Sequence, residues 1–329
     1  MALTLLALPS AALLISGCDG RDQSSSPASV ANQGRDTVGS AVTITDDAGY
    51  TLQLDHPASR VISLIPSVNE TLVAIGATDR IVGRTRYDVA PELSEIPSVG
   101  GGLDPSIEAI VALHPDVVIG WDNEKRRGVS ERLDALGIPL ISLRTQDTTD
   151  MFRGIATLGR LTGLDSSAAA VATRIREQMD EVRRSVEGRE RTRVMYVVFD
   201  DPASTAGRET FIAQAIGVAG GVSIFDDLDQ QWPTVSLEEI VRRDPDVVIL
   251  PVDDTSRTAS AAAIATLRGR AGWRDVRAVR EGRVATVPTN LTSRPGAHLG
   301  EAARVLRDAI HPEVAGQPSA ATTHATGTP

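Results

Sequence analysis

The chain has 329 residues and a formal net charge of -10 at pH 7, with 41% hydrophobic and 23% charged residues. This length predicts two domains, and the composition is ordinary for a folded globular protein. The acidic balance argues against nucleic acid as a partner, because phosphate recognition relies on basic patches. Cys18 is the one cysteine, which excludes an internal disulfide and a cysteine metal site.

The N-terminus carries the pattern of an export signal. A short apolar run is followed by residues 14–18 (LISGC), which is similar to a bacterial lipoprotein signal whose cysteine becomes lipidated. The apolar run is shorter than the roughly 18 residues of a transmembrane helix. We therefore expect residues 1–17 to be removed as a signal peptide. The mature chain would be anchored to a membrane through a lipid on Cys18, in the periplasm or at the cell surface. The alternative is a buried cysteine in an N-terminal helix.

A flexible tether is predicted at residues 18–41, which are rich in Ser, Ala, Gln, Asp and Gly. Strands and helices then alternate through residues 42–164, which predicts an N-terminal α/β lobe. We expect a turn at Pro66 and Ser67. The other expected elements are a hairpin at 43–54, strands at 60–65, 81–83, 117–120 and 139–143, and helices at 69–75, 104–113, 128–136 and 151–162.

A long helix is predicted next, because residues 165–187 keep a helical hydrophobic period without Pro or Gly. At 1.5 Å per residue it would be about 34 Å long. We interpret 165–188 as a connecting helix between two lobes; an ordinary helix of one lobe is the alternative.

A C-terminal α/β lobe is predicted over residues 189–313, on the plan of the first. Residues 314–329 are predicted to be a disordered tail. The expected elements are strands at 193–199, 247–250 and 283–287, helices at 211–216, 259–268 and 299–309, and a helix that is capped by Ser236 and ended by Pro245.

One segment occurs twice, which supports the two-lobe plan. Residues 106–119 (SIEAIVALHPDVVI) and 236–249 (SLEEIVRRDPDVVI) share nine of fourteen positions. Each copy predicts a serine-capped helix, a turn at a proline and a strand buried on both faces. The overall prediction is therefore two similar α/β lobes joined by one long helix, with a ligand cleft between them.

Catalytic and metal sites are not indicated by the sequence. The chain has no phosphate-binding loop and no nucleophile-elbow motif, and we expect it not to be an enzyme. The histidines are dispersed without ligand-type spacing, which argues against a metal carrier. His114 precedes a proline in the repeat and is interpreted as a turn residue. An enzyme or sensor that kept the same fold remains the alternative class.

Taken together, these features resemble the periplasmic binding proteins that deliver iron-siderophores, haem and cobalamin to ABC importers, and most closely the cobalamin-binding branch. The similar stretches are residues 60–83, 98–121, 131–141 and 232–249. The resemblance implies a permease dimer as partner, no cofactor, and cobalamin or a related corrinoid as the transported ligand. Haem or a ferric siderophore is the alternative ligand.

The resemblance also implies ligand-binding residues. In cobalamin binders, aromatic side chains of both lobes pack on the flat corrin ring, and the matching positions here are Tyr87, Trp121 and Trp232. The alternative is that the two tryptophans cap the lobe cores. Polar contacts are expected from two further residues, Ser67 and Arg294.

Two departures from that pattern concern the size of the cleft. Gly102 and Ser204 stand where the branch has further aromatics. They predict either a roomier cleft or another ligand, namely a related corrinoid, haem or a siderophore.

Two glutamates of the repeat are candidates for docking. Glu108 and Glu238 occupy equivalent positions in the first turn of their helices. The helix dipole alone accounts for a carboxylate there. The resemblance implies instead that one glutamate on each lobe docks onto arginines of the two permease subunits.

Overall fold

The computed structural model describes residues 40–122 and 126–315. The predicted signal peptide, Cys18, most of the tether and nearly all of the tail lie outside the described residues. Within the described part no helix combines the length and apolarity needed to cross a membrane. Val314 is buried and its amide donates to the carbonyl of His311, so the folded chain extends one residue past the predicted boundary.

The N-terminal half of the described chain builds a four-stranded, fully parallel sheet in the order β4-β3-β5-β6. A separate hairpin pairs β1 with β2, as predicted. The elements are β1 (Val42–Thr45), β2 (Thr51–Leu54), β3 (Val61–Ser63), α1 (Pro66–Ala74), η1 (Thr78–Arg80), β4 (Ile81–Gly83), η2 (Pro91–Leu93), α2 (Ile107–Ala112), β5 (Val117–Trp121), α3 (Arg126–Asp134), β6 (Leu140–Leu143) and α4 (Thr148–Thr162).

The C-terminal half builds a second parallel sheet in the equivalent order β10-β7-β11-β12. Together the two sheets confirm the predicted α/β class. The elements are α5 (Asp165–Ser185), β7 (Thr192–Tyr196), β8 (Phe199–Asp200), β9 (Ala203–Ser204), α6 (Phe211–Val218), β10 (Gly221–Ser223), α7 (Leu237–Arg243), β11 (Val247–Val252), α8 (Arg257–Gly269), η3 (Trp273–Asp275), α9 (Arg277–Arg280), β12 (Val284–Pro288), α10 (Thr289–Thr292) and α11 (Leu299–Ile310).

Three local predictions differ from the structure. The expected strand at 193–199 leaves the sheet after Tyr196, and the next residues form the β8–β9 hairpin. The three-residue strand β10 was not predicted. Pro66 and Ser67 are not a turn but begin α1, because a proline suits the first helical position, where an amide proton has no intrahelical partner.

The repeated segment has the same local structure in both halves. The hydroxyls of Ser106 and Ser236 each accept a hydrogen bond, 3.1 Å long, from the amide three residues later. His114 and Asp244 both adopt the left-handed conformation, with φ of 43° and 45°, in the turn that precedes the proline. The serine caps and the turn role of His114 are therefore confirmed.

The aspartate after each repeat proline ties two strands together. The carboxylate of Asp116 accepts from the amide of Arg60 at 2.9 Å, and that of Asp246 from the amide of Arg193 at 3.0 Å. Asp116 directly precedes β5, and its partner Arg60 directly precedes β3. Asp246 directly precedes β11, and its partner Arg193 lies in β7. The repeat thus fixes the central strand pair of both sheets.

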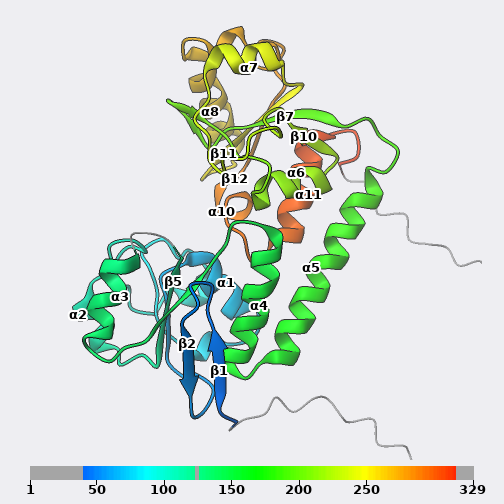
Figure 1. Ribbon diagram of the computed structural model, residues 1–329. Coiled ribbons are helices and arrows are strands. Elements are labelled where there is room, and N and C mark those ends of the chain that lie inside the picture. Colours follow the sequence, from blue (N-terminus) through cyan, green and yellow to red (C-terminus); the bar gives the residue numbers. More distant parts are fainter. Residues whose placement is uncertain (1–39, 123–125, 316–329) are drawn as a thin grey trace, which may run out of the picture. The chain divides into compact units, whose positions relative to one another are not determined.

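The long helix α5 packs against α4 from the first half and against α6 and α11 from the second (Figure 1). Its buried face includes Val171, Ile175, Met179 and Val182. These side chains belong to one hydrophobic cluster that also contains residues of both sheets. The connecting role of the helix is therefore confirmed, whereas the exact domain boundaries stay predictions.

Candidate functional site

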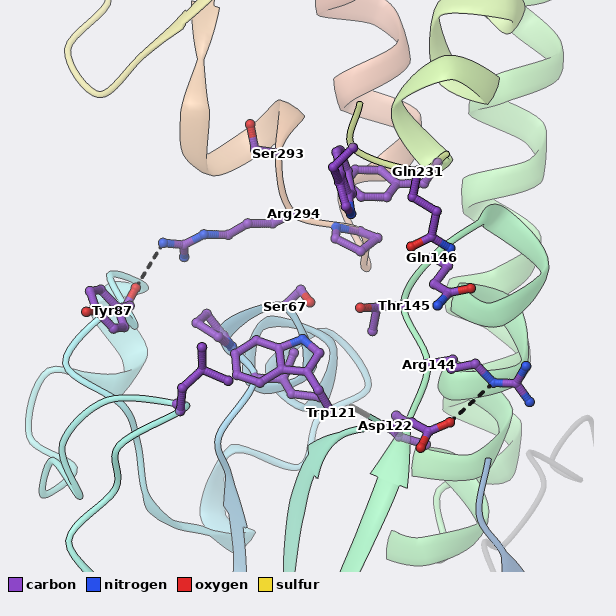
Figure 2. A pocket seen from close by; sticks show the side chains of 18 of the residues that line it. Ser67, Tyr87, Trp121, Asp122, Arg144, Thr145, Gln146, Gln231, Ser293 and Arg294 are labelled. Atoms are coloured by element: carbon purple, nitrogen blue, oxygen red, sulfur yellow. Dashed lines mark hydrogen bonds and ion pairs between the residues drawn. The ribbon is translucent and has the colours of Figure 1, made fainter. Parts of the chain in front are cut away.

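A cavity of about 600 Å³ is lined by residues of both halves of the chain (Figure 2). All five residues predicted to contact a ligand line it: Ser67, Tyr87, Trp121, Trp232 and Arg294. The other lining residues are Ile65, Pro66, Gly102, Leu103, Asp104, Asp122, Leu143, Arg144, Thr145, Gln146, Phe211, Gln231, Ser293 and Pro295.

The cavity lies at the carboxyl ends of parallel strands. Trp121 is the last residue of β5 and Leu143 the last of β6, while Ile65 follows β3. Open α/β sheets bind their ligands at this edge, because the loops after successive strands converge there. The predicted strand ends therefore lie at the rim of this cavity.

Gly102 supports the ring of Trp121. A side-chain carbon at Gly102 would lie 2.3 Å from the carbonyl oxygen of Leu64 and 2.5 Å from the indole. No side chain fits between them, so the glycine lets the indole lie against the backbone. At this position the expectation of a roomier cleft is wrong, because the indole itself occupies the space that a larger residue would need.

Tyr87 and Trp232 present large aromatic surfaces to solvent. Their relative exposures are 52% and 47%, which is unusual for side chains of this size. The ring of Phe211 contacts Trp232 edge to face, with centroids 6.4 Å apart. Trp121 is only partly exposed and packs on the core while it lines the cavity. A core-capping role therefore fits Trp121 in part and does not fit Trp232.

Arg294 connects the two halves of the chain. From the loop after α10, its guanidinium donates to the carboxylate of Glu70 on α1 at 3.1 Å and to the carbonyl of Tyr87 at 3.0 Å (Figure 2). Burial raises the pKa of Glu70, and the positive charge of Arg294 opposes that shift. The arginine thereby holds the backbone of an aromatic residue that lines the cavity.

The charged side chains that line the cavity are all paired among the described residues. Arg144 lies 3.8 Å from Asp122, Asp104 pairs with Arg86 at 2.8 Å, and Arg294 pairs with Glu70. The rest of the polar rim is uncharged and consists of Ser67, Thr145, Gln146, Gln231 and Ser293. The site therefore suits a ligand that is flat, largely apolar and rich in neutral hydrogen-bonding groups.

A second cavity of about 480 Å³ adjoins the first and shares Trp232 and Ser293 with it. Its other lining residues are Tyr196, Val198, Phe199, Ser204, Ile212, Thr234, Pro251 and Thr289. Phe199 is 68% exposed and was missed in the sequence because it sat inside a predicted strand. The sequence has no local signal that strand pairing stops at Tyr196, so Phe199 could not be singled out.

The hydroxyl of Ser293 is oriented by a chain of hydrogen bonds. The hydroxyl of Thr292 donates its one proton to the carbonyl of Pro288. Its oxygen therefore accepts from the hydroxyl of Tyr196, 3.1 Å away. Since a tyrosine has one hydroxyl proton, Ser293 donates to Tyr196 at 3.1 Å. The oxygen of Ser293 is left to accept a hydrogen bond from a ligand.

The two candidate docking glutamates are exposed in the first turns of α2 and α7. The carboxylate of Glu108 accepts from the hydroxyl of Ser106, and its own backbone amide and this hydroxyl lower its pKa. Among the described residues Glu238 has no side-chain partner. Both carboxylates are therefore accessible to another protein.

Metal ligands do not gather in the part of the chain that the structure describes. No group of three or more His, Cys, Asp or Glu side chains there is placed to hold a metal ion.

Comparisons with a family model and with known proteins agree on one class of protein, the substrate-binding proteins of transporters. The periplasmic binding protein family matches residues 61–291. A cobalamin-binding protein of Halobacterium salinarum is 32% identical over 82% of this chain and 74% of its own. An uncharacterised ABC transporter substrate-binding lipoprotein of Bacillus subtilis is 25% identical over 93% of this chain and 96% of its own.

Solved structures agree on the fold and differ in the ligand they are described as binding. The periplasmic vitamin B12-binding protein of Vibrio cholerae is 25% identical with a TM-score of 0.64, covering 79% of this chain and 99% of its own. An Fe3+-hydroxamate transport protein of Saccharomonospora viridis is 26% identical with a TM-score of 0.65, covering 82% and 99%. A haem-binding protein of Pseudomonas aeruginosa, at 24% identity and a TM-score of 0.68 over 78% and 93%, shares the fold.

Proposed function

Because the chain belongs to the periplasmic binding protein family, whose members are substrate-binding components of ABC importers and not enzymes, we propose that it captures cobalamin or a related corrinoid. Members of this family carry no cofactor, and their partners are an importer permease and a small-molecule ligand. The corrinoid would be the cargo that this protein hands to the permease.

The observation that carries the proposal is the set of aromatic faces around the first cavity. Tyr87 and Trp121 come from the first half of the chain and Trp232 from the second, and all three line one space. A flat macrocycle between them would bury a large apolar area on both faces. The second cavity lies on the other side of two of the same residues, Trp232 and Ser293.

The polar rim further favours a corrinoid over an anionic siderophore. A corrin ring carries neutral amide side chains, which match the amides of Gln146 and Gln231 and the acceptor oxygen of Ser293. A strongly anionic ligand would need unpaired positive charge, whereas Arg144 and Arg294 are both paired with carboxylates. The 32% identity with a protein named as cobalamin-binding points the same way.

Haem is the second candidate ligand, favoured by one specific observation. Tyr87 is half exposed at the cavity, and a tyrosine hydroxyl can serve as an axial ligand of haem iron. A corrinoid would use the ring of Tyr87 and not its hydroxyl. The two ligands therefore make different demands on the same side chain.

The two demands are separated by comparing Tyr87→Phe with Tyr87→Ala. For a corrinoid carrier, Tyr87→Phe retains cyanocobalamin affinity within about threefold, and Tyr87→Ala loses about tenfold, because an aromatic contact is worth roughly 1–2 kcal/mol. Calorimetry measures both values. The haem assignment would replace the corrinoid one if two results were found together. The wild-type protein would bind haem and not cyanocobalamin, and Tyr87→Phe would abolish haem binding together with the Soret shift.

We further propose that the protein is held at a membrane by a lipid on Cys18 and docks on the permease through Glu108 and Glu238. The relative described as a lipoprotein supports the first point. Exposure of both glutamates at equivalent positions of the two halves supports the second. One carboxylate on each half is what a permease dimer with two equivalent arginine surfaces would require.

A further inference from the structure

A third cavity, of about 640 Å³, lies where the C-terminal end of α5 meets the end of α6. None of its lining residues also lines the first or the second cavity. What binds in it is therefore a separate question from the ligand carried between the two halves.

Arginine side chains dominate the wall of the third cavity. Its described lining residues include Arg183, Arg184, Arg189 and Arg191, against one carboxylate, that of Glu187. The whole chain, in contrast, has a formal net charge of -10. A concave site whose charge is opposite to that of the rest of the protein favours an anionic ligand.

Two of these four guanidinium groups have no carboxylate partner among the described residues. Arg183 pairs with Asp180, and Arg189 pairs with Glu313 at 3.1 Å. The other two, Arg184 and Arg191, keep an uncompensated positive charge. This distinguishes the third cavity from the first, whose described charged side chains are all paired.

The guanidinium of Arg191 is held in place by the backbone. Its Nη2 donates to the carbonyl of Gly217 at 2.8 Å, and its Nε donates to the carbonyl of Gly221 at 3.2 Å. A guanidinium has five N–H donors, so others stay available to a ligand. The two carbonyls orient the group without cancelling its charge, and a fixed guanidinium loses little side-chain entropy when it binds an anion.

The helix dipole alone does not account for this cluster. Arg183 and Arg184 lie in the last turn of α5, where the dipole stabilises cations. Arg191 lies beyond that helix, directly before β7, and still lines the same cavity. Arginines of two segments therefore converge on one space.

A phosphate group fits this arrangement. A phosphomonoester carries a charge of about -1.5 to -2 at pH 7, which matches the two guanidinium groups that lack a carboxylate. The planar fork of an arginine also binds two phosphate oxygens at once. We infer that the third cavity is a binding site for a phosphate group, carried either by the headgroup of a membrane lipid or by a solute.

Glycerol 3-phosphate is the soluble probe, because it is a phosphomonoester and also the headgroup of phosphatidic acid. Calorimetric titration of the full chain should show saturable one-to-one binding. Arg184→Gln with Arg191→Gln should weaken it at least about tenfold, because two charge-assisted contacts are lost. Arg257→Gln with Arg274→Gln removes two exposed arginines elsewhere in the second half and should leave the affinity unchanged.

Vesicles distinguish the two sources of the phosphate. Phosphatidylcholine vesicles with and without phosphatidic acid are sedimented with the wild-type protein and with the double variant. Recruitment that requires phosphatidic acid and is lost in the variant assigns the site to a lipid headgroup. Binding of glycerol 3-phosphate without such recruitment assigns it to a solute. Both proteins have the same N-terminus, so a lipid on Cys18 would contribute equally to each.

Three results would overturn the inference: no saturable binding of either probe, unchanged binding in Arg184→Gln with Arg191→Gln, or an equal loss in the control pair. Arg191 is tied to the ends of α6 and β10, so its substitution can also disturb the fold. Arg184→Gln alone changes an exposed side chain, and it should still weaken binding about threefold or more.

Discussion

At the scale of single residues, the site depends on a glycine as much as on its aromatic side chains. The indole of Trp121 lies so close to Gly102 that no Cβ fits between them. The same position looked in the sequence like a lost aromatic contact. Its physical role is visible only when residues 102 and 121, separated along the chain, are placed side by side.

Gly102→Ala should therefore damage both the fold and the site. We expect a loss of about 1–3 kcal/mol in the free energy of unfolding from overpacking, and weaker corrinoid binding because the indole is displaced. Urea unfolding and calorimetry measure the two effects. Gly154→Ala is the control, because it lies within α4 with no atom within 4 Å of the added carbon, and it should stabilise slightly. Unchanged stability and affinity in Gly102→Ala would contradict this packing.

Three aromatic residues of the first cavity could be predicted, whereas Phe211 and the second cavity could not. Tyr87, Trp121 and Trp232 follow from the resemblance to a family and from their positions beyond strand ends. Phe199 was assigned to a strand because a run of apolar β-formers has no local signal for where pairing stops. That boundary depends on the neighbouring strands of the sheet, which lie far away in the sequence.

At the scale of elements, the repeated helix–turn–strand unit is held by its aspartates. Burial acts to raise the pKa of Asp246, but the amide of Arg193 and the guanidinium of Arg277 outweigh it and hold the pKa below its usual range. A carboxyl group whose pKa is depressed by folding stabilises the protein above its unfolded pKa of about 3.9. That stabilisation is lost as the pH falls through the lower, folded value.

Asp246→Asn should therefore lower the free energy of unfolding at pH 7. The difference between variant and wild type should shrink as the pH falls below about 4, because the wild-type carboxylate then becomes protonated. Urea unfolding at a series of pH values between 7 and 3 measures this difference. Asp55→Asn, at an exposed position, serves as the control and should track the wild type throughout. A difference between Asp246→Asn and wild type that stays constant with pH would show that the carboxylate charge does not hold the strand pair.

The repeat explains why α2, β5, α7 and β11 could be predicted. Nine identical positions gave both copies the same cap, turn and buried strand, and the structure has all three in each half. The link from Asp116 to Arg60 and from Asp246 to Arg193 was not predicted, because it joins segments more than fifty residues apart. Local patterns specify the elements, whereas pairing across the sheet requires the fold.

At the scale of the whole molecule, the proposed docking requires that both halves contact one partner. Glu108 and Glu238 lie on equivalent helices and are exposed. We expect the double variant Glu108→Ala with Glu238→Ala to lose importer-dependent corrinoid uptake by at least about tenfold, because each carboxylate contributes a charged contact to docking. Corrinoid affinity should not change, since neither residue lines the first or the second cavity.

A matched double variant controls for loss of negative charge. Glu131→Ala with Glu209→Ala removes one exposed carboxylate from each half, away from the first turns of α2 and α7. Uptake by this control should equal that of the wild type. Normal transport by the Glu108 and Glu238 variant would remove the docking role from these residues.

We propose that this protein binds a corrinoid between its two halves. Calorimetric titration of the purified full chain with cyanocobalamin measures this binding. We expect saturable one-to-one binding at micromolar affinity or tighter, weakened about tenfold or more by Trp121→Ala. Absence of binding heat and of thermal stabilisation by cyanocobalamin, with clear binding of haem or a ferric siderophore by the same sample, would contradict it.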